Sequence, residues 1–463
     1  MEAGNQEGTH ASAPERRTVS RLLGLSPAAM AAPAMRALWS DGAMLQAMLD
    51  VEAALARAAV SCGLAQPDEA VVVQAACQAG LYDLDELAAG SLRAGTPTIP
   101  LVKALTAEVS RRSPAATVAV HPGATSQDIA DTALVLQWRH AMDLIRAQGA
   151  HLRGALRALA REYAATPILG RTLLQPGPPV TFGLKAAGWE AAVHRSLLRL
   201  DDASDAAFLL QYGGAVGTLA SLDGRGAAMA AALGRELGLH VPPAPWHAHR
   251  DRLASLASAA AILGGVLGKM ARDLSLLAQA ELDEAAEPGG NGRGGSSAMP
   301  HKRNPVACVV ALAAANRLPG LLASLLAGLP QEHERAAGAW QAEASVHADI
   351  AMSVSGALDA MIEAADGLQV HPEKMAANIE RMRGLVLAER LSARLAPAMG
   401  RGRAHAFVEE LTKEAARTGE HLREVAGRRG ETAGIDLAAV FDPAGTTGEA
   451  ERFTAALLDS AEG

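Results

Sequence analysis

The stretch 251–277 constrains the possible folds more than any other part of the chain. Its apolar residues recur at alternating steps of three and four: Leu253, Leu256, Ala260, Leu263, Leu267, Met270, Leu274 and Leu277. A seam of this kind is typical of a long helix that packs nearly parallel to other helices. At ~1.5 Å per residue the helix spans roughly 40 Å, which is too long for one compact domain to cover. The pattern therefore predicts a helical bundle, and we expect the bundle to be shared between subunits.

Composition agrees with a helical fold. Hydrophobic residues make up 49% of the 463 residues and aromatic residues only 3%, and a chain rich in Ala and Leu favours helices over a β-sandwich. Helical patterns recur along the chain, and no alternating pattern is long enough to predict a sheet. We predict an all-α fold with a disordered tail over 1–17, an N-terminal helical domain over 18–115, a central long-helix bundle over 116–369 and a C-terminal helical domain over 370–463.

Charge and cysteine content exclude several classes of function. Lys and Arg number 42 against 50 Asp and Glu, the formal net charge is -8, and no basic patch is interleaved with aromatics, so we expect no nucleic-acid partner. The cysteines are few and scattered, and no carboxylate or cysteine stands at ligand spacing from His247 and His249, so we expect no metal. Neither a signal segment nor a membrane span is predicted, which indicates a soluble cytoplasmic protein.

The stretch 294–305 carries the strongest functional signal. It follows a Gly-rich segment and precedes the apolar run that starts at Val306. We expect Asn304 to be the N-cap of a helix and Pro305 its first residue. A mobile loop then brings hydroxyls, an amide and cations to the positive end of a helix, which suits the binding of an anion. An ordinary solvated Gly/Ser loop is the alternative.

Two further loops lie at the ends of long helical patterns. One covers 121–128, where simple helix capping is an alternative to binding, and the other covers 169–179. If the helices form one bundle, loops at its ends meet only where those ends coincide. We therefore expect several loops of one site to come from different subunits of an oligomer.

These three loops resemble the motif regions of the fumarase/aspartase superfamily. The segment 295–305 is similar to the superfamily signature, and 121–128 and 170–175 resemble its other two motif regions. The resemblance implies an all-α fold of three domains and a homotetramer whose central helices form one bundle. It also implies active sites that each draw on three subunits, and no cofactor.

The resemblance assigns roles to residues as well. Ser296 maps onto the catalytic acid/base that acts on carbon, and Lys302 is expected to stabilise its alkoxide. The residues expected to bind substrate are His121, Thr125, Ser126, Gln127, Thr172, Gln175, Ser297, Met299, Asn304 and Arg335.

Position 173 separates two branches of the superfamily. Lyases of the adenylosuccinate type carry a His directly after Gly-Arg-Thr, as general acid for a poor leaving group, whereas this chain has Leu173. The resemblance is closer to a lactone-forming cycloisomerase branch, in which the group expelled in the reverse direction is a carboxylate of pKa about 4 that needs no proton. We expect a small tricarboxylate substrate, held by Lys302, Arg335 and Arg171. An adenylosuccinate-type lyase and a catalytically silent scaffold are the alternatives.

Overall fold

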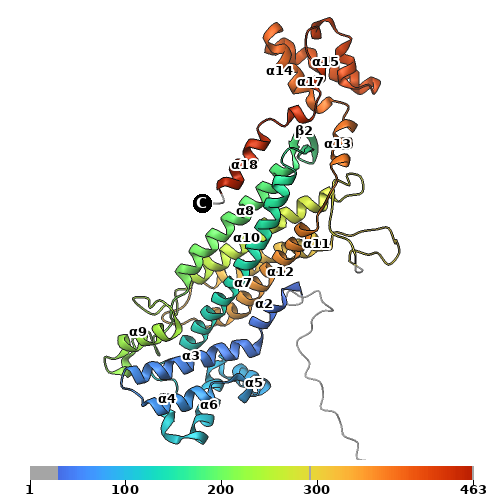
Figure 1. Ribbon diagram of the computed structural model, residues 1–463. Coiled ribbons are helices and arrows are strands. Elements are labelled where there is room, and N and C mark those ends of the chain that lie inside the picture. Colours follow the sequence, from blue (N-terminus) through green and yellow to red (C-terminus); the bar gives the residue numbers. More distant parts are fainter. Residues whose placement is uncertain (1–29, 291–292, 461–463) are drawn as a thin grey trace, which may run out of the picture.

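The protein is an elongated and almost entirely helical molecule (Figure 1). The computed structural model describes residues 30–290 and 293–460. Long helices run side by side through the middle of the molecule, and shorter helices lie at its two ends. The tail predicted over 1–17 and the first residues of the predicted domain 18–115 lie outside the described residues.

Long helices form the central bundle: α7 (Ser126–Glu162), α8 (Phe182–Ala207), α10 (Asp251–Leu277), α11 (Val306–Ala327) and α12 (Ala339–Asp366). Every residue of the predicted heptad seam on α10 is buried, which confirms the prediction from its spacing. A Cβ at Gly264 would lie 2.0 Å from a methyl carbon of Leu318 on α11. A Cβ at Gly268 would lie 2.6 Å from that of Ala315. Glycine at these two positions therefore lets α10 and α11 approach closely.

Helix α11 has an apolar surface that the other described residues leave uncovered. Its most apolar window has a mean hydropathy of 1.7, and only 28% of that window is buried, against 61% for the corresponding window of α10. Both helices are long and apolar enough to cross a membrane, as the core helices of soluble bundles also can be. Because α11 packs on α10 and α12, its outer side presents residues such as Val309, which is 57% exposed. Apolar faces of this kind are common at interaction sites of proteins.

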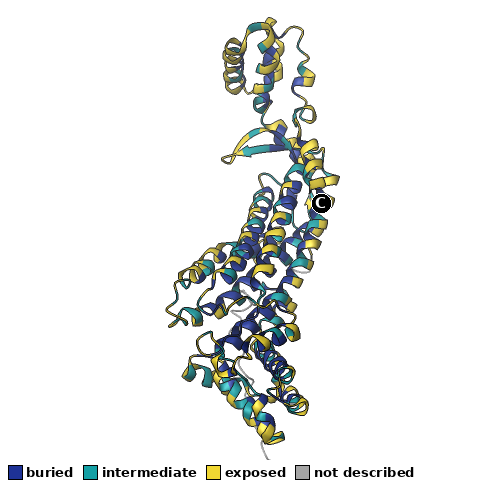
Figure 2. Ribbon diagram, turned by 90° about the vertical axis from the view of Figure 1, so that its left-hand side faces the viewer, coloured by how far each residue is buried: buried dark blue, intermediate teal, exposed yellow. Residues whose placement is uncertain are grey.

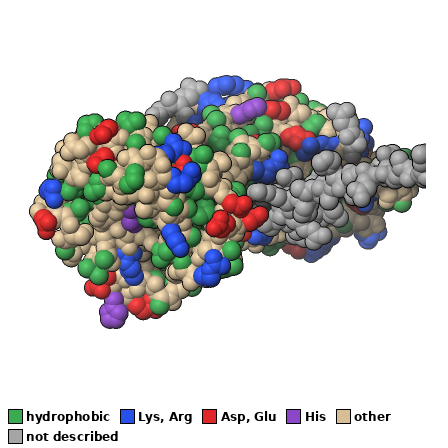
Figure 3. Space-filling model, turned by 90° about the horizontal axis from the view of Figure 1, so that it is seen from below, with side chains coloured by type: hydrophobic (Ala, Val, Ile, Leu, Met, Phe, Trp, Pro, Cys, Tyr) green, Lys and Arg blue, Asp and Glu red, His purple; other side chains and the backbone are tan. Residues whose placement is uncertain are grey.

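Shorter helices cover the lower end of the bundle in Figure 1: α2 (Pro33–Leu38), α3 (Asp41–Ser61), α4 (Pro67–Ala76), α5 (Leu84–Ala94), α6 (Thr98–Arg112) and α9 (Gly226–Leu237). Trp39, between α2 and α3, meets Trp138 of α7 edge to face with ring centroids 5.7 Å apart. The apolar core is therefore continuous from these helices into the bundle (Figure 2). Seen from this end, the Lys and Arg side chains of the described residues are interspersed with acidic and apolar ones, and they form no continuous basic patch (Figure 3).

The segment predicted as a loop over 169–179 is a β-hairpin, so the prediction of no sheet is wrong here. Strand β1 (Pro167–Thr172) pairs antiparallel with β2 (Gln175–Thr181). Leu173 and Leu174 form the turn with φ values of 51° and 64°, a conformation that tight hairpins usually reach with Asn-Gly. The Leu-Leu turn and the prolines of β2 hid the strands from sequence reasoning. Those prolines are tolerated because β2 pairs with β1 alone in a two-stranded sheet.

The C-terminal part has a core of its own. Its buried apolar residues, from Leu387 to Phe441, form a cluster separate from that of the bundle. The elements after the bundle are β4 (Gln369–Val370), which pairs with β3 (Ala285–Ala286), then α13 (Pro372–Arg381), α14 (Ala388–Met399), α15 (Arg401–Thr418), α16 (Leu422–Gly427), α17 (Leu437–Val440) and α18 (Ala450–Ser460). Helix α18 returns to pack on α8, and Leu458 belongs to the bundle core. The predicted domain 370–463 therefore includes one helix that packs with the bundle.

Candidate active site

The three motif regions lie at opposite ends of the bundle. Residues 121–128 lead into α7, which begins at Ser126, and the hairpin follows it; α7 has 37 residues, which corresponds to about 55 Å. The loop 293–304 lies in the same half of the molecule as the hairpin (Figure 1). We call the end with residues 121–128 the first-motif end and the end with the hairpin and loop 293–304 the signature end. One chain therefore does not bring its own three motif regions into one site.

At the first-motif end, Thr125 and Ser126 start α7. Thr125 is the N-cap, and its backbone N–H donates to Asp128 Oδ2 at 3.0 Å. The carbonyl oxygen of Ser126 accepts a hydrogen bond from Thr98 Oγ1 at 2.9 Å, which ties the motif to the start of α6. Both residues are half-buried. The capping role that the sequence left open is therefore present, and it leaves the Ser126 hydroxyl without a partner among the described residues.

His121 is anchored inward. Its Nδ1 lies 2.6 Å from Glu52 Oε1, and its backbone N–H donates to the same carboxylate. Burial alone would lower the pKa of His121, but the hydrogen bond and charge of the fully buried Glu52 outweigh it, so the pKa is raised. The residue takes the left-handed conformation at φ 55°. This contact positions the loop before Thr125.

Gln127 lies behind the motif, where it is 3% exposed. Its amide nitrogen donates to Asp131 Oδ2 at 3.1 Å and to the carbonyl of His247 at 2.9 Å. Its amide oxygen accepts a hydrogen bond from Arg335 Nη1 at 3.2 Å. All the polar atoms of Gln127 are thus used inside the protein, although the sequence suggested a place against substrate.

A buried ion cluster underlies the same end. The Arg250 guanidinium donates to both oxygens of Asp131, at 2.7 and 2.9 Å, and to Glu343 at 3.0 Å. Burial alone would raise the pKa of Asp131, but the charge of Arg250 together with hydrogen bonds from Arg250, Trp340 and Gln211 outweighs burial and holds that pKa below its usual range. Burial raises the pKa of Glu343, and Arg250 offsets only part of that effect. The cluster joins the starts of α7, α10 and α12.

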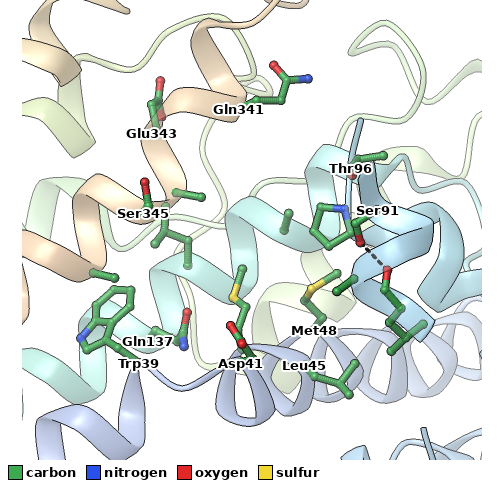
Figure 4. Close-up of a pocket in the computed structure, with 18 of the residues that line it drawn as sticks. Trp39, Asp41, Leu45, Met48, Ser91, Thr96, Gln137, Gln341, Glu343 and Ser345 are labelled. Carbon is green, nitrogen blue, oxygen red and sulfur yellow. Dashed lines mark hydrogen bonds between the residues drawn. The ribbon is translucent and has the colours of Figure 1, made fainter. Parts of the chain in front are cut away.

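A large cleft of about 1070 Å³ opens beside this cluster, between α3, α5, α7 and α12 (Figure 4). Its walls are mostly apolar and include Trp39, Leu45 and Met48. Five carboxylates line it: Asp41, Asp85, Asp131, Glu343 and Asp349. Among the residues that line it, the only cation is Arg250, which is already paired. The cleft therefore offers no free positive charge to a tricarboxylate.

At the signature end, the loop 293–304 is closed at its base by Asn304. The Asn304 backbone N–H and side-chain amide both donate to the carbonyl of Gly294, at 2.8 and 3.1 Å. Gly294 has φ 68°, and a Cβ there would lie 2.6 Å from the Asn304 carbonyl oxygen, so only glycine fits. Asn304 was predicted to contact substrate. One of its amide hydrogens instead forms the hydrogen bond to Gly294 that closes the loop.

The helix start predicted at 304–305 is wrong in detail. Pro305 is the N-cap residue and α11 begins at Val306. The carboxylate of Glu287 accepts the backbone N–H groups of Ala307 and Cys308 at 2.9 and 2.7 Å. The positive end of α11 is therefore occupied by an acidic side chain of the protein itself and does not bind an external anion.

The remaining side chains of the loop face outward. Ser296 is half-buried, and its Oγ accepts the backbone N–H of Met299 at 3.2 Å and, more weakly, that of Ala298 at 3.4 Å. Ser297, Met299 and Lys302 are exposed. Lys302 has no side-chain partner among the described residues, so its ammonium group is available to an anion.

The hairpin presents Thr172 and Gln175 at its tip. The two residues pair across the strands and are exposed, and Leu173 between them is 97% exposed. Arg171, a candidate cation for substrate, instead donates through both terminal nitrogens to the buried Glu284 at 2.8 Å each. Asn378 of α13 donates to the same carboxylate. Arg171 thus fixes the hairpin to the bundle.

Comparison with known proteins decides the family. A family model described as "Lyase" matches residues 27–320, and one described as "Adenylosuccinate lyase C-terminus" matches 384–457. The chain belongs to the Lyase family, within the fumarase/aspartase superfamily. The resemblance seen in the three motif regions is thereby confirmed.

Individual relatives of this Lyase-family chain carry different names. It is 44% identical to the 3-carboxy-cis,cis-muconate cycloisomerase of Bradyrhizobium diazoefficiens, over 94% of this chain and 97% of the relative. It is 40% identical to the nitrosuccinate lyase of Streptomyces davaonensis, over 87% and 86%. The crystal structure of the 3-carboxy-cis,cis-muconate lactonizing enzyme from Pseudomonas putida matches with a TM-score of 0.90 at 44% identity, over 95% of this chain and 99% of that one.

Sequence reasoning missed the buried groups of this Lyase-family site. Asp131, Arg250 and Glu343 were given no role, Asp128 entered only as a member of the motif region 121–128, and His247 was weighed as a metal ligand. A usable signal was present, because Asp128 and Asp131 are acids one helical turn apart in the apolar stretch 129–136. Among the described residues, no group of three or more His, Cys, Asp or Glu side chains is placed to hold a metal ion.

Proposed function

We propose that this chain closes 3-carboxy-cis,cis-muconate to 4-carboxymuconolactone. The observation that carries the proposal is the 44% identity to a cycloisomerase of that name over nearly the whole of both chains. The site agrees with it. Ser296, whose hydroxyl accepts two backbone N–H groups, and Lys302, which has no side-chain partner among the described residues, stand on a glycine-hinged loop, and an apolar residue follows Gly-Arg-Thr. The substrate is a small tricarboxylate, and no cofactor takes part.

The reaction needs one proton and no other reactant. One carboxylate oxygen of the substrate forms a bond to a carbon of the C=C bond, and the π-electron pair moves to the neighbouring carbon. That carbon takes a proton from the Oγ–H of Ser296, and the lactone results with all atoms retained. In the reverse direction the Ser296 alkoxide removes the proton, and the ring oxygen leaves as a carboxylate without acid assistance.

The loop is built to stabilise the serine alkoxide that forms. The backbone N–H groups of Met299 and Ala298 already point at Ser296 Oγ, so a negative oxygen there gains charge-assisted hydrogen bonds. Lys302, six residues further along the same loop and without a partner among the described residues, adds positive charge. Leu173 in place of a histidine makes the opposite wall apolar, which strengthens both interactions by excluding water.

The active site is assembled from several chains of a cytoplasmic homotetramer. About 55 Å of α7 separates the first-motif end from the signature end within one chain, so only neighbouring chains can bring the two ends together. The uncovered apolar side of α11 supplies a surface on which the bundles of different chains pack. Thr125 and Ser126 then come from one chain, and Ser296 and Lys302 from another.

Parallel assays test the reaction. Purified protein is offered 3-carboxy-cis,cis-muconate, adenylosuccinate and nitrosuccinate, and ultraviolet absorbance is followed for each. We expect loss of the conjugated-diene absorbance with the first substrate only. Turnover of nitrosuccinate alone supports the second candidate, an elimination of the kind named for the Streptomyces relative. Turnover of adenylosuccinate alone, or of none of the three, rejects the cycloisomerase.

A further inference from the structure

Two carboxylates stand one helical turn apart at the start of α7 and face into the protein. Asp128 and Asp131 are each 1% exposed, and residues three apart on a helix share one face. Each carboxylate accepts hydrogen bonds from segments that are distant in sequence. We call these two residues the carboxylate pair.

Asp128 fixes the glycine turn at 213–214. Its four hydrogen-bond donors are the backbone N–H groups of Thr125, Gly213 and Gly214, at 3.0, 3.0 and 2.9 Å, and His247 Nε2 at 2.6 Å. A Cβ at Gly213 would lie 2.5 Å from Pro245, and Gly214 has φ 69°, so the turn has room for no other residue. An ionised carboxylate bonded to backbone N–H groups is a strong acceptor, and Asp128 therefore holds the turn in one conformation.

Asp131 fixes the side chain of Gln127. Besides its ion pair with Arg250, it accepts the Gln127 amide at 3.1 Å, the Gln211 amide at 3.2 Å and the Trp340 indole N–H at 2.9 Å. The amide oxygen of Gln127 is thereby turned away from Asp131 and toward Arg335.

Gly214, held by Asp128, and Gln127, held by Asp131, both accept hydrogen bonds from Arg335. Its Nη2 donates to the carbonyl of Gly214 at 2.7 Å, its Nη1 to Gln127 Oε1 at 3.2 Å, and its Nε to the carbonyl of Ala215 at 3.0 Å. All three acceptors are uncharged, and among the described residues no carboxylate pairs with this half-buried guanidinium. Each terminal nitrogen keeps one further N–H. Arg335 is thus a fixed cation with an unbalanced charge and spare donors.

We propose that Asp128 and Asp131 are positioning residues that orient Arg335 as the receptor for one carboxylate of the substrate, with Gln127 as the connecting link and not itself a substrate ligand. This inference rests on the proposed tricarboxylate substrate. A guanidinium held in place before binding loses little conformational freedom when an anion arrives. Asp131 acts on Arg335 through Gln127, and Asp128 acts through Gly214.

Gln127→Met and Gln211→Met form a matched pair of variants. Both remove one buried amide that donates to Asp131, but only Gln127 contacts Arg335. We expect Gln127→Met to raise KM for the tricarboxylate about tenfold or more, since a hydrogen bond to a charged group is lost, with kcat little changed. Gln211→Met should lower stability to a similar degree and leave KM within about twofold. Equal KM effects from the two variants would overturn the proposal.

A double-mutant cycle with Arg335→Met separates positioning from general damage. If Gln127 acts through Arg335, then Gln127→Met adds nothing to KM once Arg335 is gone, so the two effects are not additive. Additive effects would place Gln127 in a separate role and reject the inference.

Hydrogen exchange tests the proposed action of Asp128 on Arg335 through Gly214, and it needs no assay of turnover. In Asp128→Asn the amides of Gly213 and Gly214 should exchange faster, and citrate, used as a tricarboxylate probe in calorimetry, should bind more weakly than to the wild-type protein. Unchanged exchange and citrate binding would remove Asp128 from the proposal. If the wild-type protein binds citrate in an Arg335-dependent way but does not turn over 3-carboxy-cis,cis-muconate, the proposed function fails and the positioning role stands.

Discussion

The two ends of the bundle use their polar groups in opposite ways. At the first-motif end, Asp128, Asp131, Arg250 and Gln127 are buried, and their polar atoms are bonded to one another. At the signature end, Ser296 and Lys302 lie on an open loop and keep donors free. A satisfied buried network gives precise placement and no reactivity, whereas an unsatisfied exposed group is available for chemistry. Under the proposed function, one end therefore supplies the positioning of substrate and the other end supplies the proton transfer.

Removing the reactive hydroxyl should produce the largest effect on rate. Ser296→Ala is expected to lower kcat on 3-carboxy-cis,cis-muconate by about 10³-fold or more, because the proton donor to carbon is lost. Size-exclusion chromatography should show the same oligomer as the wild-type protein. Ser297→Ala is the control, and it should lower kcat less than Ser296→Ala does, since the expected role of Ser297 is substrate binding alone. A near wild-type rate for Ser296→Ala would place the acid elsewhere and remove the contrast between the two ends.

Breaking the buried ion cluster should instead affect stability. Arg250→Met leaves the carboxylates of Asp131 and Glu343 buried without their cation, and the loss of one partner of such a pair costs about 3–5 kcal/mol of unfolding free energy. Urea denaturation measures the change. Arg293→Met, which removes a partly exposed pair with Glu363 at the signature end, should cost less than about 1 kcal/mol. Equal losses of unfolding free energy in Arg250→Met and Arg293→Met would show that the ion pairs at the two ends contribute equally to stability.

The first-motif end should also weaken in mild acid. Burial, with a further contribution from Arg250, lowers the pKa of His347 from its ordinary value of 6.5 to about 3. Below about pH 6.5, His347 therefore binds a proton in the unfolded chain but stays neutral in the folded chain until the pH approaches 3. Unfolding free energy should fall as pH drops from 6.5 toward 3, by roughly 1.4 kcal/mol per pH unit, or about 2 kcal/mol at pH 5.

A glutamine at position 347 isolates this contribution. His347→Gln keeps an acceptor for the indole N–H of Trp138, which lies 3.2 Å from His347 Nδ1, but it cannot be protonated. Urea unfolding of both proteins at pH 7 and pH 5 should show a smaller acid loss for the variant. The same loss in both would mean that His347 is not the group responsible.

The smallest effect is expected at the hairpin tip. Leu174→Gly relieves a left-handed conformation at φ 64° in a side chain that is 76% exposed, and should raise the hairpin's stability by about 1 kcal/mol. Protection of the β1–β2 amides in hydrogen exchange measures it. Leu92→Gly, at another exposed position, inside α5, should destabilise its helix by about 1 kcal/mol. Lower protection in the hairpin variant would show that Leu174 is held by packing and not strained.

The sequence was sufficient to predict the parts of the fold that depend on periodicity. The seam on α10 was placed residue by residue, because a heptad pattern fixes which face is buried. The hairpin was missed because its turn and its prolines break the usual strand rules. The cap of α11 was misplaced because Glu287, twenty residues earlier in the chain, takes the backbone groups that a local cap would bind. Contacts between distant residues leave no local pattern to find.

The candidate site shows the same division. The motif regions were found because their residue types and spacing are unusual. The roles of Arg171, Gln127 and Arg335 depend on contacts with Glu284, His247 and Gly214, which lie far away in sequence. The sequence alone shows which side chains are hydrogen-bond donors and acceptors, but it does not show which of them are already paired within the protein. Only the unpaired groups remain available to bind substrate.

Helix α7 also acts as a spacer of fixed length. Under the proposed assembly its two ends serve different active sites, so the number of residues between Ser126 and Glu162 sets the distance and the angle between those sites. Inserting one residue would shift one end by ~1.5 Å and rotate it by roughly 100° about the axis. Surface loops can gain or lose residues freely. Helix α7 has to keep its number of residues as long as the same helix in the neighbouring chains keeps its own.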